Sequence, residues 1–208
     1  MTLVLAIVGQ VDPDPGMSHV NLTVSDFAVA DRGGATDWSM LTFALAGLLF
    51  LGSLRPIGSV RTFVARAALV LFSGGMVTAA IAPTDPGLTL TATGYVHRWA
   101  SIAAFVALPA AALGLIRVLP PAVHRMIRWL VLIAVVFMIA MAVSSSFAGR
   151  ADIGVIERVL LGDETVLLAA LAFGSWRAGG GSVRDVITIM VRRLSHFRSI
   201  SARRGSAH

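Results

Sequence analysis

Long apolar runs alternate with short polar segments along most of the chain. Four runs carry no charged residue over 17 to 21 positions: residues 38–54, 67–84, 99–116 and 129–149. A helix needs about 17 to 25 mostly apolar residues to cross the hydrocarbon core of a bilayer. Each run therefore predicts a membrane-spanning helix, and we expect the second of these helices to begin near Thr62.

Two further segments predict helices that depart from this pattern. Residues 1–11 are apolar, but eleven helical residues span only about 16 Å, so they predict a first membrane helix that is short or truncated. The segment lacks the basic stretch and cleavage site of a signal peptide. Residues 153–176 reach membrane length only by including four charged residues: Glu157, Arg158, Asp163 and Glu164. Such charges must lie at the interface, pair with one another or face a polar interior.

The fold class follows from these six segments. We expect an all-α integral membrane helix bundle of about six transmembrane helices, formed by residues 1–177. Residues 178–208 form a second unit, in which apolar residues recur at helical spacing and arginines occupy the other faces. This pattern predicts a basic amphipathic helix that lies on the inner leaflet of the membrane.

Composition supports the membrane assignment and excludes several classes of chemistry. Hydrophobic residues make up 56% of the chain and charged residues 13%, whereas soluble domains carry about a quarter charged residues. The absence of cysteine excludes disulfides, thiol catalysis and cysteine-bound metals. All 17 basic residues are arginine, which together with abundant alanine, glycine and valine suggests a GC-rich bacterial genome.

The placement of the arginines predicts how the chain is oriented. The formal net charge is +6, but the arginines flank the predicted spans, so we expect no nucleic-acid partner. With six spans, one side of the membrane receives Arg55, Arg61, Arg117, Arg125, Arg128 and Arg177. The positive-inside rule makes this side cytoplasmic. We therefore expect a bacterial plasma-membrane protein with both termini in the cytoplasm. A polar, acidic loop over residues 11–37, the Asp85 loop and the 149–152 turn then lie outside.

Polar residues on the predicted outer side form a candidate site. They are Ser25, Asp26, Asp85, His97, Glu157 and Arg158. One hypothesis is general acid–base chemistry on a lipid-like substrate, with His97 as the base and an aspartate as its partner. The other is structural, because Asp26 and Asp85 occur where turns and helix caps use aspartate. We favour the structural interpretation, and the sequence leaves both open.

A bound metal or cofactor is a weaker hypothesis. His19, His97, Asp26 and Asp85 could in principle surround zinc, but no His-x-x-x-His or Glu-x-x-His pair is present. Haem would need a second histidine near the end of a span, and the sequence offers none. We therefore expect neither a metal nor an organic cofactor.

Four short motifs in a fixed order suggest a family. They are Val24-Ser25-Asp26-Phe27, the Ala-Pro-Thr-Asp-Pro run at 82–86, the Gly-Tyr-Val-His run at 94–97, and Glu157-Arg158. This order resembles the domain of unknown function 998 family of bacterial and archaeal multi-pass membrane proteins. The resemblance covers about residues 1–176, and the short first span departs from it. It implies a helix bundle distantly similar to six-helix proteins of the FGF-receptor-activating and damage-regulated autophagy modulator types. It implies no established activity.

Three functions are compatible with these features. The first is a non-enzymatic protein whose polar outer rim binds membrane lipids or a membrane-protein partner. The second is an outer-leaflet hydrolase or transferase that uses His97 with Asp85, Asp26, Glu157 or Ser25. Catalysis would require His97 within hydrogen-bond reach of one of these carboxylates, at the floor of an open cavity. A transporter is a third possibility, but a few charges in one span give little evidence for a translocation path.

Overall fold

The computed structural model of the chain describes residues 2–11, 18–30, 34–54, 59–85 and 89–180. Within these ranges all regular structure is helical and no strand occurs. The elements are α1 (Thr2–Val11), α2 (Val24–Ala30), α3 (Ala35–Ser53), α4 (Val60–Ile81), α5 (Ala92–Leu115), the short 3-10 helix η1 (Ile116–Val118), α6 (Pro121–Phe147) and α7 (Ile153–Ala178). The amphipathic helix predicted for the tail lies outside the described residues.

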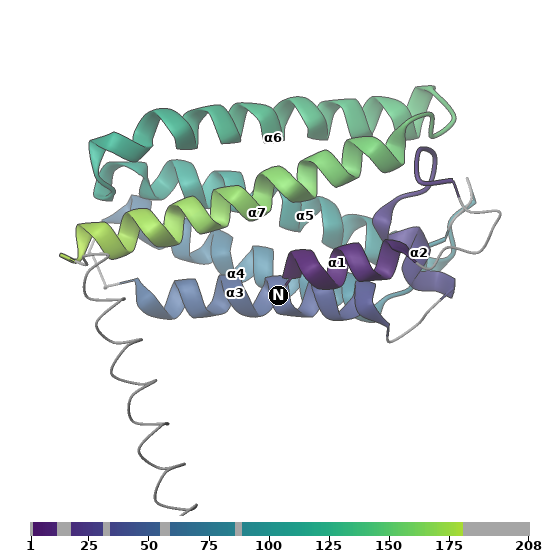
Figure 1. Cartoon of the computed structure of the whole chain (residues 1–208), viewed down its shortest axis with the longest axis horizontal. Coiled ribbons are helices and arrows are strands. Elements are labelled where there is room, and N and C mark those ends of the chain that lie inside the picture. Colours follow the sequence, from purple (N-terminus) through teal and green to yellow (C-terminus); the bar gives the residue numbers. More distant parts are fainter. Residues whose placement is uncertain (1, 12–17, 31–33, 55–58, 86–88, 181–208) are drawn as a thin grey trace, which may run out of the picture.

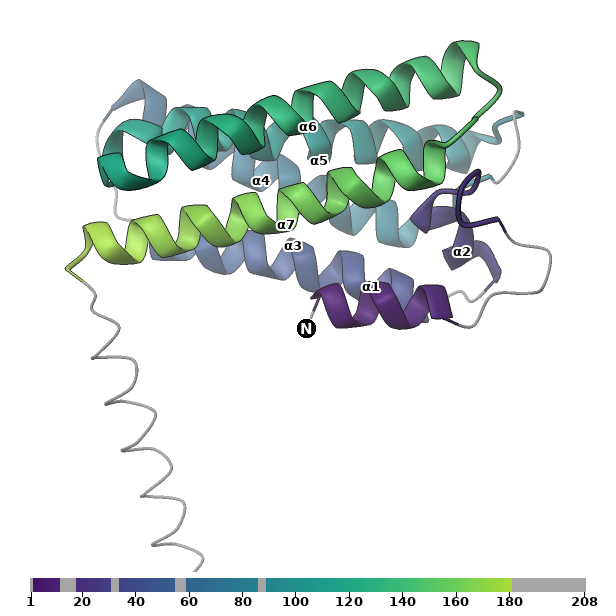
Figure 2. The same cartoon turned by 45° about the horizontal axis from the view of Figure 1, so that its top comes forward.

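The five long helices run side by side along one bundle (Figures 1 and 2), which confirms the predicted fold class. Four of them, α3 to α6, are long and apolar enough to cross a membrane. Helix α7 has 26 residues and lies along the same bundle, although it carries the four charges noted above. Helix α1 has only ten residues and packs against α3, where Thr2 and Thr42 share a hydroxyl hydrogen bond of 3.1 Å.

Side-chain caps define where two of the long helices begin. The hydroxyl of Ser59 accepts the backbone N–H of Thr62 at the start of α4. The hydroxyl of Thr91 accepts the N–H of Gly94 at 3.1 Å at the start of α5. Pro121 occupies the first turn of α6, where its fixed φ suits a helix and its missing N–H costs nothing.

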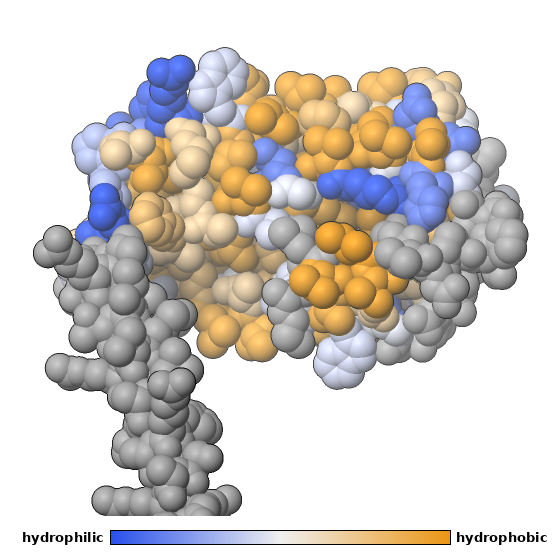
Figure 3. All heavy atoms as spheres, viewed as in Figure 1, coloured by the Kyte–Doolittle hydropathy of each residue, from blue (hydrophilic) through white to orange (hydrophobic). Residues whose placement is uncertain are grey.

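The core lies between α3, α4, α5 and α7, and α6 contributes little to it. Leu69 and Phe72 of α4, Leu108 of α5 and Leu167 of α7 are fully buried. Of an apolar 18-residue stretch of α6, 17% is buried inside the protein, whereas 39–44% of the corresponding stretches of α3, α4 and α5 is buried. Helix α6 packs mainly against α7 and leaves most of its apolar surface uncovered by protein. On the face shown in Figure 3, hydrophobic side chains cover much of the long side of the bundle.

The segment over residues 11–37 corrects the sequence prediction of a polar loop. It contains α2, a seven-residue helix with an acidic residue in its first turn. Val24, Phe27 and Ala28 of this helix are buried in the protein. A helix this short has too few residues to show a helical pattern in the sequence. Its stability comes from contacts with distant parts of the chain, which are described below.

The two ends of the bundle differ in charge. We call one the α2 end, because α2 lies there with the first residues of α3, α5 and α7 and the last residues of α4 and α6 (Figure 1). We call the other the tail end, where α7 finishes. The described arginines at the tail end are Arg61, Arg66, Arg117, Arg125, Arg128 and Arg177. The described part of the chain therefore segregates the loops as the sequence predicts, with all candidate site residues at the α2 end.

Candidate functional site

A tight turn between α6 and α7 directs Arg150 toward α2. Gly149, Arg150 and Asp152 all have left-handed backbone conformations, with φ of 58°, 68° and 57°. The turn is closed by the hydroxyl of Ser144, which donates to the carbonyl of Ala151 at 2.6 Å. Arg150 forms an ion pair with Asp26, whose side chain is only 1% exposed. The attraction between the two charges offsets part of the cost of removing both from water.

Residues Glu157 and Arg158 hold the chain around α2 against α7. The Glu157 carboxylate accepts the backbone N–H of Val24. The Arg158 guanidinium donates to the carbonyls of His19 and Leu22, at 2.7 and 3.1 Å. Three of the predicted site residues, Asp26, Glu157 and Arg158, therefore stabilise the position of one segment, residues 18–30.

Glycine at position 154 allows this close approach. Its N–H donates to the carbonyl of Val20 at 2.9 Å. A Cβ atom at this position would overlap the Leu22 carbonyl oxygen and lie 2.5 Å from that of His19. Any larger residue would push the 18–30 segment away from α7.

Asp85 has a local structural role. Its carboxylate accepts the backbone N–H of Thr91 at 2.7 Å and the Thr91 hydroxyl at 2.9 Å. Gly94 lies so close that a Cβ atom there would overlap the Asp85 carboxylate. Asp85 therefore closes the loop before α5 and supports the cap at its first turn, as the structural interpretation expects.

His97 is oriented by backbone carbonyls. The ring is 6% exposed, and Nδ1 lies 2.9 Å from both the Ala79 and the Ala82 carbonyl oxygens. Because both neighbours are acceptors, Nδ1 carries the proton and donates it. Among the described residues, no carboxylate hydrogen-bonds to His97. The carboxylate–histidine pair that the catalytic hypothesis requires is therefore not formed in this part of the chain.

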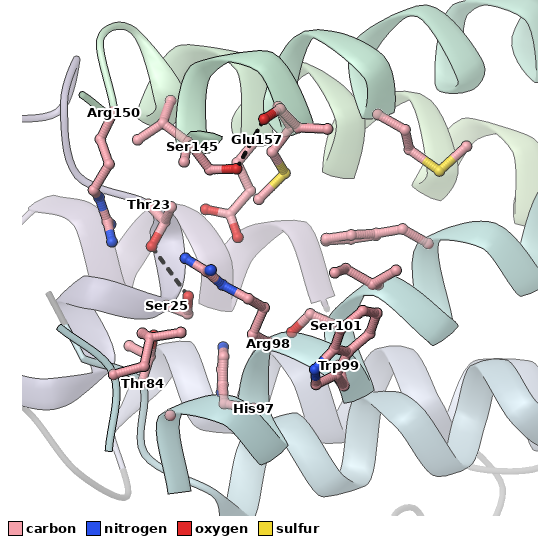
Figure 4. Close-up of a pocket in the computed structure, with 18 of the residues that line it drawn as sticks. Thr23, Ser25, Thr84, His97, Arg98, Trp99, Ser101, Ser145, Arg150 and Glu157 are labelled. Carbon is pink, nitrogen blue, oxygen red and sulfur yellow. Dashed lines mark hydrogen bonds between the residues drawn. The ribbon is translucent and has the colours of Figure 1, made fainter. Parts of the chain in front are cut away.

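A cavity of about 380 Å³ opens beside His97, between α2, α5, α6 and α7 (Figure 4). This volume lies within the range of small-molecule sites, about 300–1,000 Å³. The polar side chains that line the cavity include Ser25, His97, Arg98, Ser101, Arg150 and Glu157. The apolar side chains that line it include Phe105, Val106, Met138 and Met141. The cavity, hereafter the α5–α6 pocket, is amphipathic.

The predicted site residues divide between the pocket and its supports. Ser25, Asp85, His97 and Glu157 line the pocket, while Asp26 lies behind it and Arg158 faces the 18–30 segment. His19 does not line the pocket with His97. Its ring stacks on that of Phe27, with the two ring centroids 4.9 Å apart. In the described ranges no three histidine, aspartate or glutamate side chains gather as metal ligands would.

Arg98 is a pocket residue that the sequence analysis missed. Figure 4 shows its side chain extending from α5 into the pocket. The sequence places Arg98 directly before the uncharged run at 99–116, where it resembles an ordinary flanking charge. The signal that could have found it is the end of the bundle at which it lies. Arg98, Arg150 and Arg158 all lie at the end that the positive-inside rule leaves poor in arginine.

Two further acids on α7 lie away from the pocket. Asp163 and Glu164 are buried, and Glu164 is 0% exposed. Both carboxylate oxygens of Glu164 lack a hydrogen-bond partner among the described residues. A charged side chain inside a membrane span is costly unless it lies at the interface, pairs with another charge or faces a polar interior. Glu164 has no hydrogen-bond partner within the described part of the protein.

The fold defines an all-α, multi-pass membrane protein, and a pocket lined by both polar and apolar side chains lies at one end of its helix bundle. The family model described as "Protein of unknown function (DUF998)" matches residues 1–174, so the chain belongs to this family. The resemblance inferred from the four motifs is thereby confirmed. No curated protein and no solved structure matches the chain.

Proposed function

We propose that this protein binds a lipid-like amphiphile in the α5–α6 pocket and does not change it chemically. The observation that carries the proposal is the amphipathic lining of one continuous cavity. Polar groups such as His97 and Arg98 can contact a headgroup, while Phe105 and Met141 can cover a hydrocarbon chain. Sites for small molecules commonly combine an apolar wall with a few convergent polar groups.

The mouth of the pocket supports a ligand that arrives from the bilayer. Trp99, Ile102 and Val106 of α5 line the pocket and are 64%, 43% and 52% exposed. The neighbouring helix, α6, presents an apolar surface that little protein covers. A lipid hydrocarbon chain that moves from the bilayer into the pocket between α5 and α6 would therefore exchange one apolar environment for another.

The roles of the carboxylates favour binding over catalysis. Asp85 holds Thr91, Asp26 pairs with Arg150, and Glu157 accepts the Val24 amide. A general base needs a partner that orients it and a position from which it can take a proton. These carboxylates are already used to hold the local fold together.

The proposed site faces the outside of a bacterial plasma membrane, with both termini in the cytoplasm. The support is the arginine distribution, because the tail end carries arginines in successive loops and the α2 end carries most of the acids. Membrane lipids are the partners that this arrangement favours. The uncovered surface of α6 is also available to another membrane protein.

Native mass spectrometry of the protein, titrated with a bacterial lipid extract in detergent, tests the binding role. Ala142 lines the pocket, whereas its neighbour Val143 does not. We expect Ala142→Trp to fill the pocket and reduce the bound lipid about tenfold. The matched variant Val143→Trp adds the same side chain outside the pocket and should bind like the wild type. Equal binding by both variants would contradict the proposal.

A second candidate function is hydrolysis or transfer on the same ligand, and one observation favours it. The two carbonyls that accept from Nδ1 of His97 leave Nε2 with a lone pair in the neutral ring. Such a nitrogen in a pocket can act as a general base. If the protein is an enzyme, incubation with the lipid extract will release cleaved or transferred headgroups, and His97→Gln will abolish this release. Binding alone predicts lipid recovered intact from both proteins.

A further inference from the structure

Among the described residues, each charged side chain that lines the α5–α6 pocket has a partner, with the exception of Arg98. Arg150 pairs with Asp26, Glu157 accepts the Val24 amide, and Asp85 accepts from Thr91. Arg98 forms no hydrogen bond and no ion pair with any residue of the described ranges. Within the described part of the chain, the guanidinium of Arg98 is therefore available to whatever occupies the pocket.

The physical chemistry of a guanidinium restricts what that occupant can be. Arginine stays protonated in proteins and has five N–H donors but no acceptor. A half-buried cation without a partner is costly, because removal from water is not offset by an opposite charge. The planar fork of donors matches phosphate and carboxylate groups, which it binds through two parallel hydrogen bonds.

The position of Arg98 relative to the apolar wall links this charge to a chain-bearing ligand. One helical turn or more beyond Arg98, the same helix contributes Ile102, Phe105 and Val106 to the pocket. The hydroxyl of Ser101 also lines the pocket and can donate to a bound oxyanion. A headgroup at Arg98 would therefore place its chain along the apolar side of α5.

We propose that the α5–α6 pocket selects an amphiphile with a negatively charged phosphate or carboxylate headgroup, which Arg98 binds. This inference rests on the proposed binding function and adds the chemical class of the ligand. The hydrocarbon chain lies against Phe105, Val106, Met138 and Met141.

The test compares three probes on the full-length protein in nanodiscs of phosphatidylcholine, with binding counted by native mass spectrometry. Dodecyl phosphate carries both the chain and the anion, dodecyltrimethylammonium carries the same chain with a cation, and inorganic phosphate carries the anion alone. We expect dodecyl phosphate to bind at least tenfold more tightly than either of the others. A charge-assisted interaction of this kind changes affinity by about 10- to 100-fold.

Variants of Arg98 test the residue itself. Arg98→Gln should reduce binding of dodecyl phosphate about 10- to 100-fold and leave binding of the cationic probe unchanged or stronger. Arg98→Lys keeps the charge but loses the fork, and should retain part of the affinity. Arg117→Gln removes an exposed arginine at the tail end and should have no effect. Thermal melting of each variant confirms that it is folded.

The outcomes separate this inference from the proposed function. If both dodecyl probes bind equally and Arg98→Gln changes nothing, charge selection is wrong, while amphiphile binding stands. If inorganic phosphate binds as tightly as dodecyl phosphate, the pocket takes a free oxyanion and the amphiphile assignment fails. If no probe binds, both proposals fail.

Discussion

Position 164 places a carboxylate inside the bundle without a hydrogen-bond partner among the described residues. Seven positions earlier on the same helix, Glu157 is also buried, but its carboxylate accepts the Val24 amide. The two residues have the same chemistry and opposite surroundings. An unsatisfied buried polar group costs about 1–3 kcal/mol, whereas a satisfied one contributes to stability. Glu164 therefore destabilises the folded state, whereas Glu157 stabilises it.

We predict that Glu164→Leu raises the free energy of unfolding by about 1–3 kcal/mol, because it removes an unsatisfied buried group. Glu157→Leu should lower it by a similar amount, because it leaves the Val24 N–H buried without an acceptor. Unfolding of both variants by SDS in mixed micelles measures the difference. A loss of stability in Glu164→Leu as large as that in Glu157→Leu would show that Glu164 has a partner that supports the fold.

At the residue scale the sequence grouped polar residues at one end of the protein but did not show what each of them contacts. It placed Ser25, Asp85, His97 and Glu157 at one end of the protein, and the structure brings these four to one pocket. It could not show which charges neutralise each other, because Asp26 and Arg150 lie 124 positions apart. The availability of Arg98 is likewise visible only after the other described charges that line the pocket have been matched to their partners.

At the scale of helices, hydropathy predicted the four candidate spans α3 to α6 and placed the start of α4 closely, but it placed the starts of α5 and α6 too late. The run at 99–116 corresponds to α5, which begins earlier, at Ala92, because Thr91 caps it there. The run at 129–149 corresponds to α6, which begins at Pro121. Uncharged runs report the hydrocarbon-embedded part of a helix, whereas the helix itself continues into the interface, where arginine side chains reach water.

Glycine at 154 and at 162 provides a matched pair on α7. We predict that Gly154→Ala lowers the free energy of unfolding by about 1–3 kcal/mol, because the new Cβ overpacks the 18–30 segment. A Cβ atom added at Gly162 would meet no packing neighbour within 4 Å. Gly162→Ala should therefore raise stability by about 0.5–1 kcal/mol through helix propensity.

SDS titration again gives the stability of both variants. Limited proteolysis adds a local measurement, since the 18–30 segment should become more sensitive to cleavage in Gly154→Ala alone. Equal stability of the two variants would mean that the segment moves aside without cost.

At the scale of the whole molecule, charge is segregated along the bundle axis. The arginines of the tail end and the acids of the α2 end lie at opposite ends of the apolar bundle. This arrangement could be predicted from the sequence, because it depends only on the order of charged and apolar segments. The pocket could not be predicted, because Ser25, Arg98, Ser145 and Glu157 come from four separate segments whose contacts depend on tertiary packing.

The absence of native cysteine makes the orientation directly measurable. We predict that a membrane-impermeant maleimide added to intact cells labels Asp152→Cys at the α2 end and spares Arg125→Cys at the tail end. After the cells are permeabilised, both positions should react. Labelling of Arg125→Cys alone in intact cells would reverse the orientation and place the pocket in the cytoplasmic leaflet.

Most of the apolar surface of α6 is not covered by protein, and this affects how occupancy of the pocket is controlled. A ligand that enters between α5 and α6 diffuses within one leaflet, so its supply is set by its mole fraction among neighbouring molecules. Diluting a suspension of membranes would leave occupancy unchanged, whereas altering leaflet composition would change it. The protein would then report on the make-up of its own surroundings, independently of the aqueous phase.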